Sequence, residues 1–258
     1  MAGAVRYRVG LVGCGRMGEV IANALAEGKV EGCRLVGVTG RNPEKVDAFA
    51  KCHGCTGADS IEALLALNPD YVIEVATAEA LKQCALPVLS AGKTLICLSM
   101  GALFDEAFAG QVRQAALEHG GRLVLASGVI GGLDVMTAAA MCGDLQATVI
   151  KRKPSSQSES CPPPLRSLPD EFEGSAREGF QLSPAHLNII LAGATACGGL
   201  DNTRFRLELV PDGERLSFGL EAEGDFGAAK VDIRPGGKLQ SSGLAAWSAL
   251  AALKRLTA

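Results

Sequence analysis

The stretch YRVGLVGCGRMG at residues 7–18 decides the fold. Its first half is largely apolar and predicts a short buried strand, and apolar residues recur at helical spacing from Val20 to Leu25. Three glycines, Gly13, Gly15 and Gly18, stand at the junction of the two segments. The stretch therefore predicts a strand, a glycine turn and a helix, in that order.

The glycine spacing in this turn is typical of a Rossmann dinucleotide-binding unit. In such a unit the first glycine permits the tight turn, the second lets the backbone approach a pyrophosphate, and the third lets the helix pack closely. Backbone amides at the start of the helix then face the anion. We predict that the pyrophosphate binds at Gly13, Gly15, Arg16, Met17 and Gly18.

Predicted strands and helices alternate as far as residue 127. After the strand at 33–40, Pro43 suits the start of a helix. The later strands are expected at residues 71–77, 94–99 and 122–127, and the later helices at 61–67, 78–91 and 104–119. This alternation predicts an α/β fold with a parallel, doubly wound sheet. We therefore expect a Rossmann dinucleotide-binding domain over residues 1–127.

The pattern changes after Ser127, and we expect a second, α+β domain over residues 128–241. Its strands are expected at residues 145–153, 203–210, 215–224 and 228–234, the last three antiparallel, with a helix at 185–196. The Pro/Ser-rich residues 154–169 predict an extended loop. The apolar-faced helix at 242–256 is expected to pack back on the first domain. Apolar residues of the strands predict a sheet face that a second copy of the chain covers, which favours a homodimer.

Composition narrows the classes of partner. The 258 residues carry a net charge of −3, so no global positive charge favours a nucleic acid or an anionic membrane. No uncharged apolar run reaches the about 18 residues that a membrane span needs, and the first residues lack the apolar core of a signal peptide. We expect a cytoplasmic protein that binds a small molecule.

The histidines and cysteines offer little for a metal. Nine cysteines fit a reducing compartment better than a disulfide framework. Only Cys52-His53-Gly54-Cys55 has metal-like spacing, and no second pair of ligands completes it, so we predict a surface turn and no metal site. His53 and His119 are both expected to face solvent.

The end of the second predicted strand bears on the choice of dinucleotide. A carboxylate that binds the adenosine ribose is usual there, but this chain has Gly40 followed by Arg41. Arg41 suits a 2′-phosphate or an adenine ring, although an arginine at a helix start is often only a surface charge. We therefore expect NADP as the cofactor in preference to NAD, with NAD left open.

Seven stretches, in order, resemble the L-aspartate dehydrogenase family over almost the whole chain. They are VIEVATAEALKQCALPVLSAGK, LSMGALFDE, ASGVIGGLDV, KRKP, FEGSARE, the segment Pro184–Asn188, and EGDFG. The resemblance implies a homoserine-dehydrogenase-like, two-domain oxidoreductase, in which the second domain, here residues 128–241, is a mixed-sheet domain that binds the substrate and mediates dimerisation. It also implies reversible oxidative deamination of L-aspartate to iminosuccinate and then oxaloacetate.

The resemblance also implies roles for single residues. Val129 corresponds to a small residue that contacts the cofactor, and Asn188 to an asparagine that contacts the nicotinamide carboxamide or the substrate, although an asparagine at a helix start often satisfies only local backbone. Thr77 and Ser99 are assigned to the cofactor site as well. Counting back from Gly224, the family's catalytic histidine corresponds to Phe218, which cannot transfer a proton.

His186 replaces the first asparagine of the family's Asn-x-Asn segment, two residues before Asn188. It is our candidate catalytic residue, and its other reading is a polar residue at a helix start. Asp134 and the basic run Lys151, Arg152 and Lys153 are weaker candidates. Because strand residues alternate between faces, at most two of the three cations serve one site, and a solvated strand end is the simpler interpretation.

The leading hypothesis is an NAD(P)-dependent enzyme acting on the C–N bond of a small amino acid or its imine, with L-aspartate as the substrate that the resemblance implies. Two alternatives stay open. One is an imine reductase or dehydrogenase with another substrate, because Phe218 makes that part of the pocket more apolar. The other is a noncatalytic, dinucleotide-binding regulatory protein.

Overall fold

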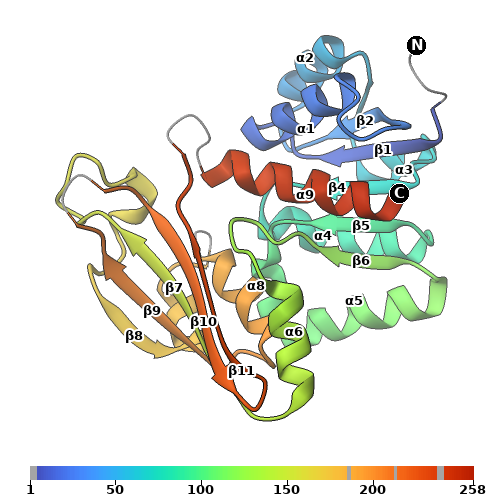
Figure 1. The fold of residues 1–258 in the computed structure, drawn as a ribbon. Helices are drawn as coiled ribbons and strands as arrows, with labels where there is room; N and C mark the ends of the chain where they lie inside the picture. The colour runs from blue at the N-terminus through green and yellow to red at the C-terminus, as the bar shows by residue number, and fades with distance from the viewer. Residues whose placement is uncertain (1–4, 185–186, 212–213, 237–240) are drawn as a thin grey trace. The chain divides into compact units, whose positions relative to one another are not determined.

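The computed structural model describes residues 5–184, 187–211, 214–236 and 241–258 (Figure 1). The chain divides into two compact units. The first comprises Met1–Ala126 together with Ser242–Ala258, and the second comprises Ser127–Ser241.

The first unit is built on a six-stranded sheet in the order β3-β2-β1-β4-β5-β6, with every neighbouring pair parallel. Its strands are β1 Tyr7–Val12, β2 Cys33–Thr39, β3 Thr56–Ala58, β4 Tyr71–Glu74, β5 Thr94–Cys97 and β6 Arg122–Leu125. Its helices are α1 Arg16–Ala26, α2 Pro43–His53, α3 Ile61–Ala66, α4 Ala78–Ser90, the 3-10 helix η1 Met100–Phe104, α5 Glu106–His119 and α9 Ser241–Thr257. The predicted doubly wound parallel sheet is confirmed.

Apolar side chains cover both faces of this sheet, which is why the strands read as nearly continuous hydrophobic runs. On one face, residues of α1, α2 and α9 form a core with Val9, Leu11 and Ile73 of the strands. On the other, residues of α3, α4 and α5 pack with Val72 and Leu95. The last helix therefore belongs to the first unit, and the Tyr71 hydroxyl donates a hydrogen bond to the Leu256 carbonyl at 3.1 Å.

Two details of this unit differ from expectation. Strand β3, with only three residues, is too short to show a periodicity and was not predicted. The helix expected from residue 104 begins at Glu106 instead, because the Asp105 side chain caps α5 by accepting a hydrogen bond from the Phe108 amide at 3.2 Å. The residues before it form η1 instead.

The second unit is built on a mixed sheet in the order β11-β10-β7-β9-β8. Its elements are α6 Leu133–Cys142, β7 Leu145–Lys153, the 3-10 helix η2 Pro163–Leu165, β8 Phe172–Ser175, α7 Ala176–Leu182, α8 Asn188–Ala196, β9 Thr203–Leu209, β10 Ser217–Gly224 and β11 Gly227–Ile233. β10 and β11 form an antiparallel hairpin. The expectation that β9 and β10 are antiparallel neighbours is wrong, because β7 lies between them and pairs parallel with β9.

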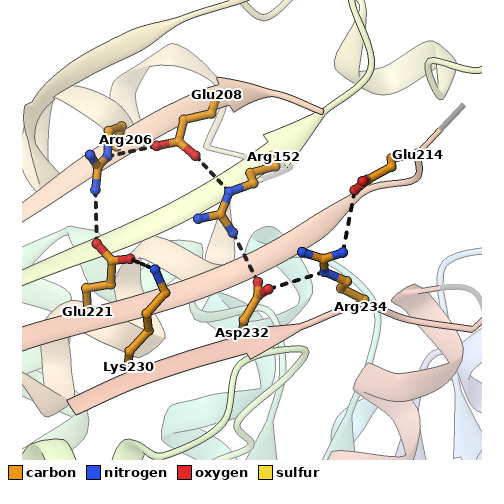
Figure 2. Close-up of polar contacts among 8 residues, drawn as sticks. All are labelled: Arg152, Arg206, Glu208, Glu214, Glu221, Lys230, Asp232 and Arg234. Atoms are coloured by element: carbon orange, nitrogen blue, oxygen red, sulfur yellow. Dashed lines mark hydrogen bonds and ion pairs between the residues drawn. The ribbon is translucent and has the colours of Figure 1, made fainter. Parts of the chain in front are cut away.

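Side chains alternate across this sheet, so its two faces differ in chemistry. One face carries buried Val149, Phe205 and Leu220. Helix α8 covers it so closely that a Cβ at Gly193 would collide with Val149. The opposite face carries ion pairs (Figure 2). The apolar sheet face expected for a dimer is therefore wrong, since the apolar side chains lie under the unit's own helices.

Candidate functional site

The glycine turn of the first unit connects β1 to α1. The Gly13 amide donates a hydrogen bond to the Thr39 carbonyl at 2.9 Å, which fixes the turn against β2. Gly13 has φ +117°, a conformation that favours glycine. A Cβ at Gly18 would collide with the Gly13 carbonyl oxygen, so the helix can approach the turn only with glycine at this position.

Gly15 leaves the start of α1 open. It is the N-cap residue and no side chain caps the helix there; among the described residues, no atom beyond its neighbours in the chain lies within 4 Å of the position that its Cβ would take. The first-turn amides, which receive no hydrogen bond from an N-cap side chain, and the positive end of the helix dipole suit an anion. These features fit a dinucleotide pyrophosphate. Arg16 is exposed and Met17 is half-buried in the same turn.

The end of β2 lies beside this turn. A Cβ at Gly40 would lie 3.3 Å from the Cys14 sulfur and 3.3 Å from a Val46 methyl group, so position 40 has little room for a larger side chain. Arg41 follows it and is exposed. Asn42 then caps α2 by accepting a hydrogen bond from the Lys45 amide at 3.0 Å.

A buried carboxyl group, which the sequence reasoning missed, joins the ends of β4 and β5. Glu74 is completely buried; its Oε1 accepts a hydrogen bond from the Ala76 amide at 2.7 Å and its Oε2 accepts one from the Ser99 amide at 3.1 Å. Burial raises the pKa of Glu74, and the hydrogen bonds from Ala76 and Ser99 oppose that shift. A charged residue inside the apolar run VIEVAT was the available signal.

Glu74 thereby positions two of the residues assigned to the cofactor. Thr77 follows β4, and its hydroxyl caps α4 by accepting a hydrogen bond from the Ala80 amide at 3.2 Å. Ser99 follows β5 and is buried. Both lie past the carboxyl ends of neighbouring parallel strands, the edge at which open α/β sheets bind ligands.

The second unit holds the remaining candidates. Val129 lies half-buried before α6, and Asn188 is the half-buried first residue of α8. His186 lies outside the described residues. Asp134 is exposed in the first turn of α6.

Position 218 lies on β10 and faces a lysine. Phe218 is directly opposite Lys151 in the β10–β7 pairing, and Lys151 is opposite Leu207 on β9. Both Phe218 and Lys151 are only 3% exposed. Burial lowers the pKa of Lys151 to about 8, and the neighbouring charge of Lys153 contributes. The interpretation of residues 151–153 as a solvated strand end is therefore wrong.

The other two cations of this run have carboxylate partners. Lys153 is fully buried and its Nζ lies 2.8 Å from Oδ1 of Asp170, whose pKa this contact holds well below the usual range. Asp170 also accepts hydrogen bonds from the Ser155 hydroxyl at 2.9 Å and the Ser156 amide at 2.7 Å. This contact anchors the Pro/Ser-rich loop to β7.

Arg152 points to the opposite face, as alternation requires, and is part of a network of ion pairs. It lies 2.7 Å from Glu208 and 3.1 Å from Asp232 (Figure 2). The network continues through Arg206, Glu221, Lys230, Arg234 and Glu214. The network joins four cations to four carboxylates, so its own charges balance.

Of the two histidines that the structure describes, one differs from expectation in its exposure to solvent. His53 ends α2, its side chain is 6% exposed, and its Nε2 lies 2.7 Å from Oε2 of Glu19. The prediction that His53 faces solvent is therefore wrong, because α1 supplies a carboxylate partner. His119 is exposed at the end of α5. Among the residues that the structure describes, no cluster of three His, Cys, Asp or Glu side chains suits a metal ion, and no helix is long and apolar enough to cross a membrane.

Two family models match the chain in succession. Residues 13–126 match the NAD-binding domain of homoserine dehydrogenase, and residues 134–256 match the C-terminal domain of aspartate dehydrogenase. Together they span both units.

Curated relatives and solved structures agree with these matches. The chain is 36% identical over 262 residues to the L-aspartate dehydrogenase of Ruegeria pomeroyi, covering 97% of this chain and 92% of that protein. It is 36% identical over 223 residues to L-aspartate dehydrogenase 1 of Bordetella pertussis, covering 85% and 83%. The crystal structure of the aspartate dehydrogenase of Thermotoga maritima aligns with a TM-score of 0.72 at 19% identity, covering 98% and 97% of the two chains, which supports the fold.

Proposed function

Because the chain belongs to the aspartate dehydrogenase family, whose members are dinucleotide-binding oxidoreductases, we propose that it oxidises L-aspartate reversibly to iminosuccinate, which water converts to oxaloacetate and ammonia. The observation that carries the proposal is the 36% identity to the L-aspartate dehydrogenase of Ruegeria pomeroyi over 97% of this chain.

The dinucleotide supplies the hydride acceptor, and the chain's residues hold it and the substrate. The amides at the start of α1 bind the pyrophosphate, because Gly15 leaves them open. Thr77 and Ser99 line the adjoining edge of the sheet, and Val129 and Asn188 contact the nicotinamide end. NADP is preferred over NAD, since Gly40 brings no carboxylate to repel a 2′-phosphate and Arg41 is exposed beside it.

A second candidate is favoured by Phe218. If the family's catalytic histidine corresponds to this position, the pocket is more apolar and aspartate turnover is weaker than in relatives. The enzyme would then act on another small amino acid or its imine. His186 is the sequence's own candidate for the missing acid or base.

One assay separates these functions. Turnover of NADP(H) and NAD(H) is measured with a panel of amino acids, and with the matching oxo acids plus ammonia. Aspartate or oxaloacetate as the best substrate supports the first function. A different best substrate supports the second, and dinucleotide binding without any turnover supports a regulatory protein.

We also propose a homodimer through the charged face of the second unit's sheet. The balanced ion pairs there present alternating charges, which two copies can match across a two-fold axis. Light scattering at micromolar concentration should give twice the mass of 26.6 kDa. A monomer mass would contradict this assembly.

A further inference from the structure

We infer that Lys151 is a catalytic residue that accepts and returns the proton on the substrate nitrogen, the task that Phe218 cannot perform. The inference rests on the proposed function. It assigns to a lysine on β7 the role that the family resemblance gives to an imidazole on β10.

The geometry of the sheet supports this assignment. Residues directly opposite each other on antiparallel strands project from the same face, with Cβ atoms about 4.5–5.5 Å apart. Phe218 and Lys151 are such a pair. A lysine side chain at position 151 therefore reaches into the space in which an imidazole at position 218 would act.

Burial gives this lysine a suitable proton affinity. Among the described residues, the charged and titratable groups that act on it are Lys153 on the same strand face, which Asp170 holds, and Cys161 in the loop. Burial lowers the pKa of Lys151 to about 8, with Lys153 lowering it further and Cys161 raising it. A base that titrates near the working pH is effective in proton transfer, and desolvated lysines serve as general bases.

The neutral Nζ of Lys151 takes one proton from the substrate ammonium group, and the electrons of the broken N–H bond remain on the substrate nitrogen. That lone pair forms the C=N bond as the hydride leaves Cα for the nicotinamide. In the reverse direction the Lys151 ammonium returns the proton to the amine.

Lys153 is the natural comparison, because it is equally buried on the same face of the same strand. It is bound to Asp170 at 2.8 Å and its ammonium group also lies 3.4 Å from the Pro154 carbonyl oxygen. We assign it the structural role of anchoring the loop. Its charge acts on Lys151 only at a distance.

The test compares pH profiles of kcat/KM for the amino acid in the purified full chain. The parent should show an ionisation near pH 8. Lys151→Met should lower kcat by about 10²–10⁴-fold and remove that ionisation. Lys153→Met should keep the ionisation and move it to higher pH, because a repelling positive charge is gone. Lys151→Arg, which keeps the charge and cannot deprotonate, should lose turnover as Lys151→Met does.

A rescue experiment guards against a purely structural effect. Adding Phe218→His to Lys151→Met should restore at least 10-fold of the lost turnover, because the imidazole supplies a new proton carrier. Failure to rescue in a variant whose unfolding transition matches the parent would overturn the inference. If Lys151→Met fails to fold, the parent alone decides, and a pH profile of kcat/KM that is flat between pH 7 and 9 would overturn the inference.

The remaining outcomes separate this inference from the proposed function. If the parent is active and Lys151→Met leaves its turnover unchanged, the proposed function stands and the role of Lys151 is rejected. The same holds if His186→Asn lowers turnover more than Lys151→Met does. A parent that binds dinucleotide and turns over no substrate in the panel rejects both.

Discussion

The Glu74 carboxyl group accepts a hydrogen bond from the Ser99 amide at 3.1 Å, and this bond connects the end of β5 to the end of β4. The other Glu74 oxygen accepts a hydrogen bond from the Ala76 amide, so one buried side chain sets the positions of two loops at the ligand-binding edge.

Replacing Glu74 with glutamine should destabilise the first unit. One of the two oxygens becomes an NH₂ group that faces a backbone N–H, which leaves a buried donor without its acceptor at a cost of about 1–3 kcal/mol. Dinucleotide affinity should fall as well, since the loops carrying Thr77 and Ser99 lose their tie. Chemical denaturation and dinucleotide titration measure the two effects, and exposed Glu62→Gln is the control, with a change within about 0.5 kcal/mol. A variant with parent-like stability and affinity would reject this role for Glu74.

Gly15→Ala should weaken dinucleotide binding and leave the stability of the fold nearly unchanged. In the described part of the chain, no atom beyond the neighbouring residues lies within 4 Å of the added Cβ, and the φ of −92° suits any residue, so the free energy of unfolding should change by less than about 0.5 kcal/mol. The methyl group would stand where the pyrophosphate approaches, and dinucleotide affinity should fall at least 10-fold. Gly18→Ala is the contrasting variant, because its Cβ collides with the Gly13 carbonyl and should reduce stability. Parent-like dinucleotide affinity in Gly15→Ala would move the pyrophosphate elsewhere.

Arg41→Ala should change the preference between the two dinucleotides. A charge-assisted contact to a 2′-phosphate contributes about 1.5–3 kcal/mol, so NADPH affinity should fall by about 10-fold or more while NADH affinity stays nearly unchanged. Fluorescence titration with both dinucleotides measures the ratio. Tighter NADH binding by the parent would show that the assignment of the 2′-phosphate site to Arg41 is wrong.

The stability of the folded chain should rise between pH 8 and 10.5 through Lys151. Its pKa falls from 10.5 to about 8 on folding, so in this window the unfolded chain binds more protons, and stability rises with pH. The gain is up to about 3 kcal/mol, and it is absent below pH 8, where both states are protonated. Urea denaturation of the parent and Lys151→Met across the window gives the difference. Parallel curves for the two proteins would show that Lys151 keeps an ordinary pKa.

Much of the first unit was predictable because its signals are local. Its longer strands and helices carry their own periodicity, and several helices carry capping signals, as with Asn42 and Pro43 at the start of α2. The second unit was harder, since its strand order depends on pairing between distant segments. Nothing within residues 203–210 indicates that β9 pairs with β7 and is separated from β10.

The candidate site shows the same division. The glycines, Thr77 and Ser99 are predicted as cofactor-site residues from motifs and resemblance, whereas the sequence favours a solvated basic run that includes Lys151. Its burial depends on its strand neighbours β10 and β9, segments that the sequence does not place beside it. The carboxylate partner of His53 was missed for the same reason, because Glu19 lies 34 residues away.

The most direct test of the central claim is NADPH-linked reductive amination of oxaloacetate by the purified chain. Oxidation of NADPH is followed with oxaloacetate and ammonia, with each omitted in turn. The account predicts oxidation that requires both, yields L-aspartate, and is at least 10-fold slower in Lys151→Met. Dinucleotide binding without oxidation for oxaloacetate or any other oxo acid plus ammonia would contradict it.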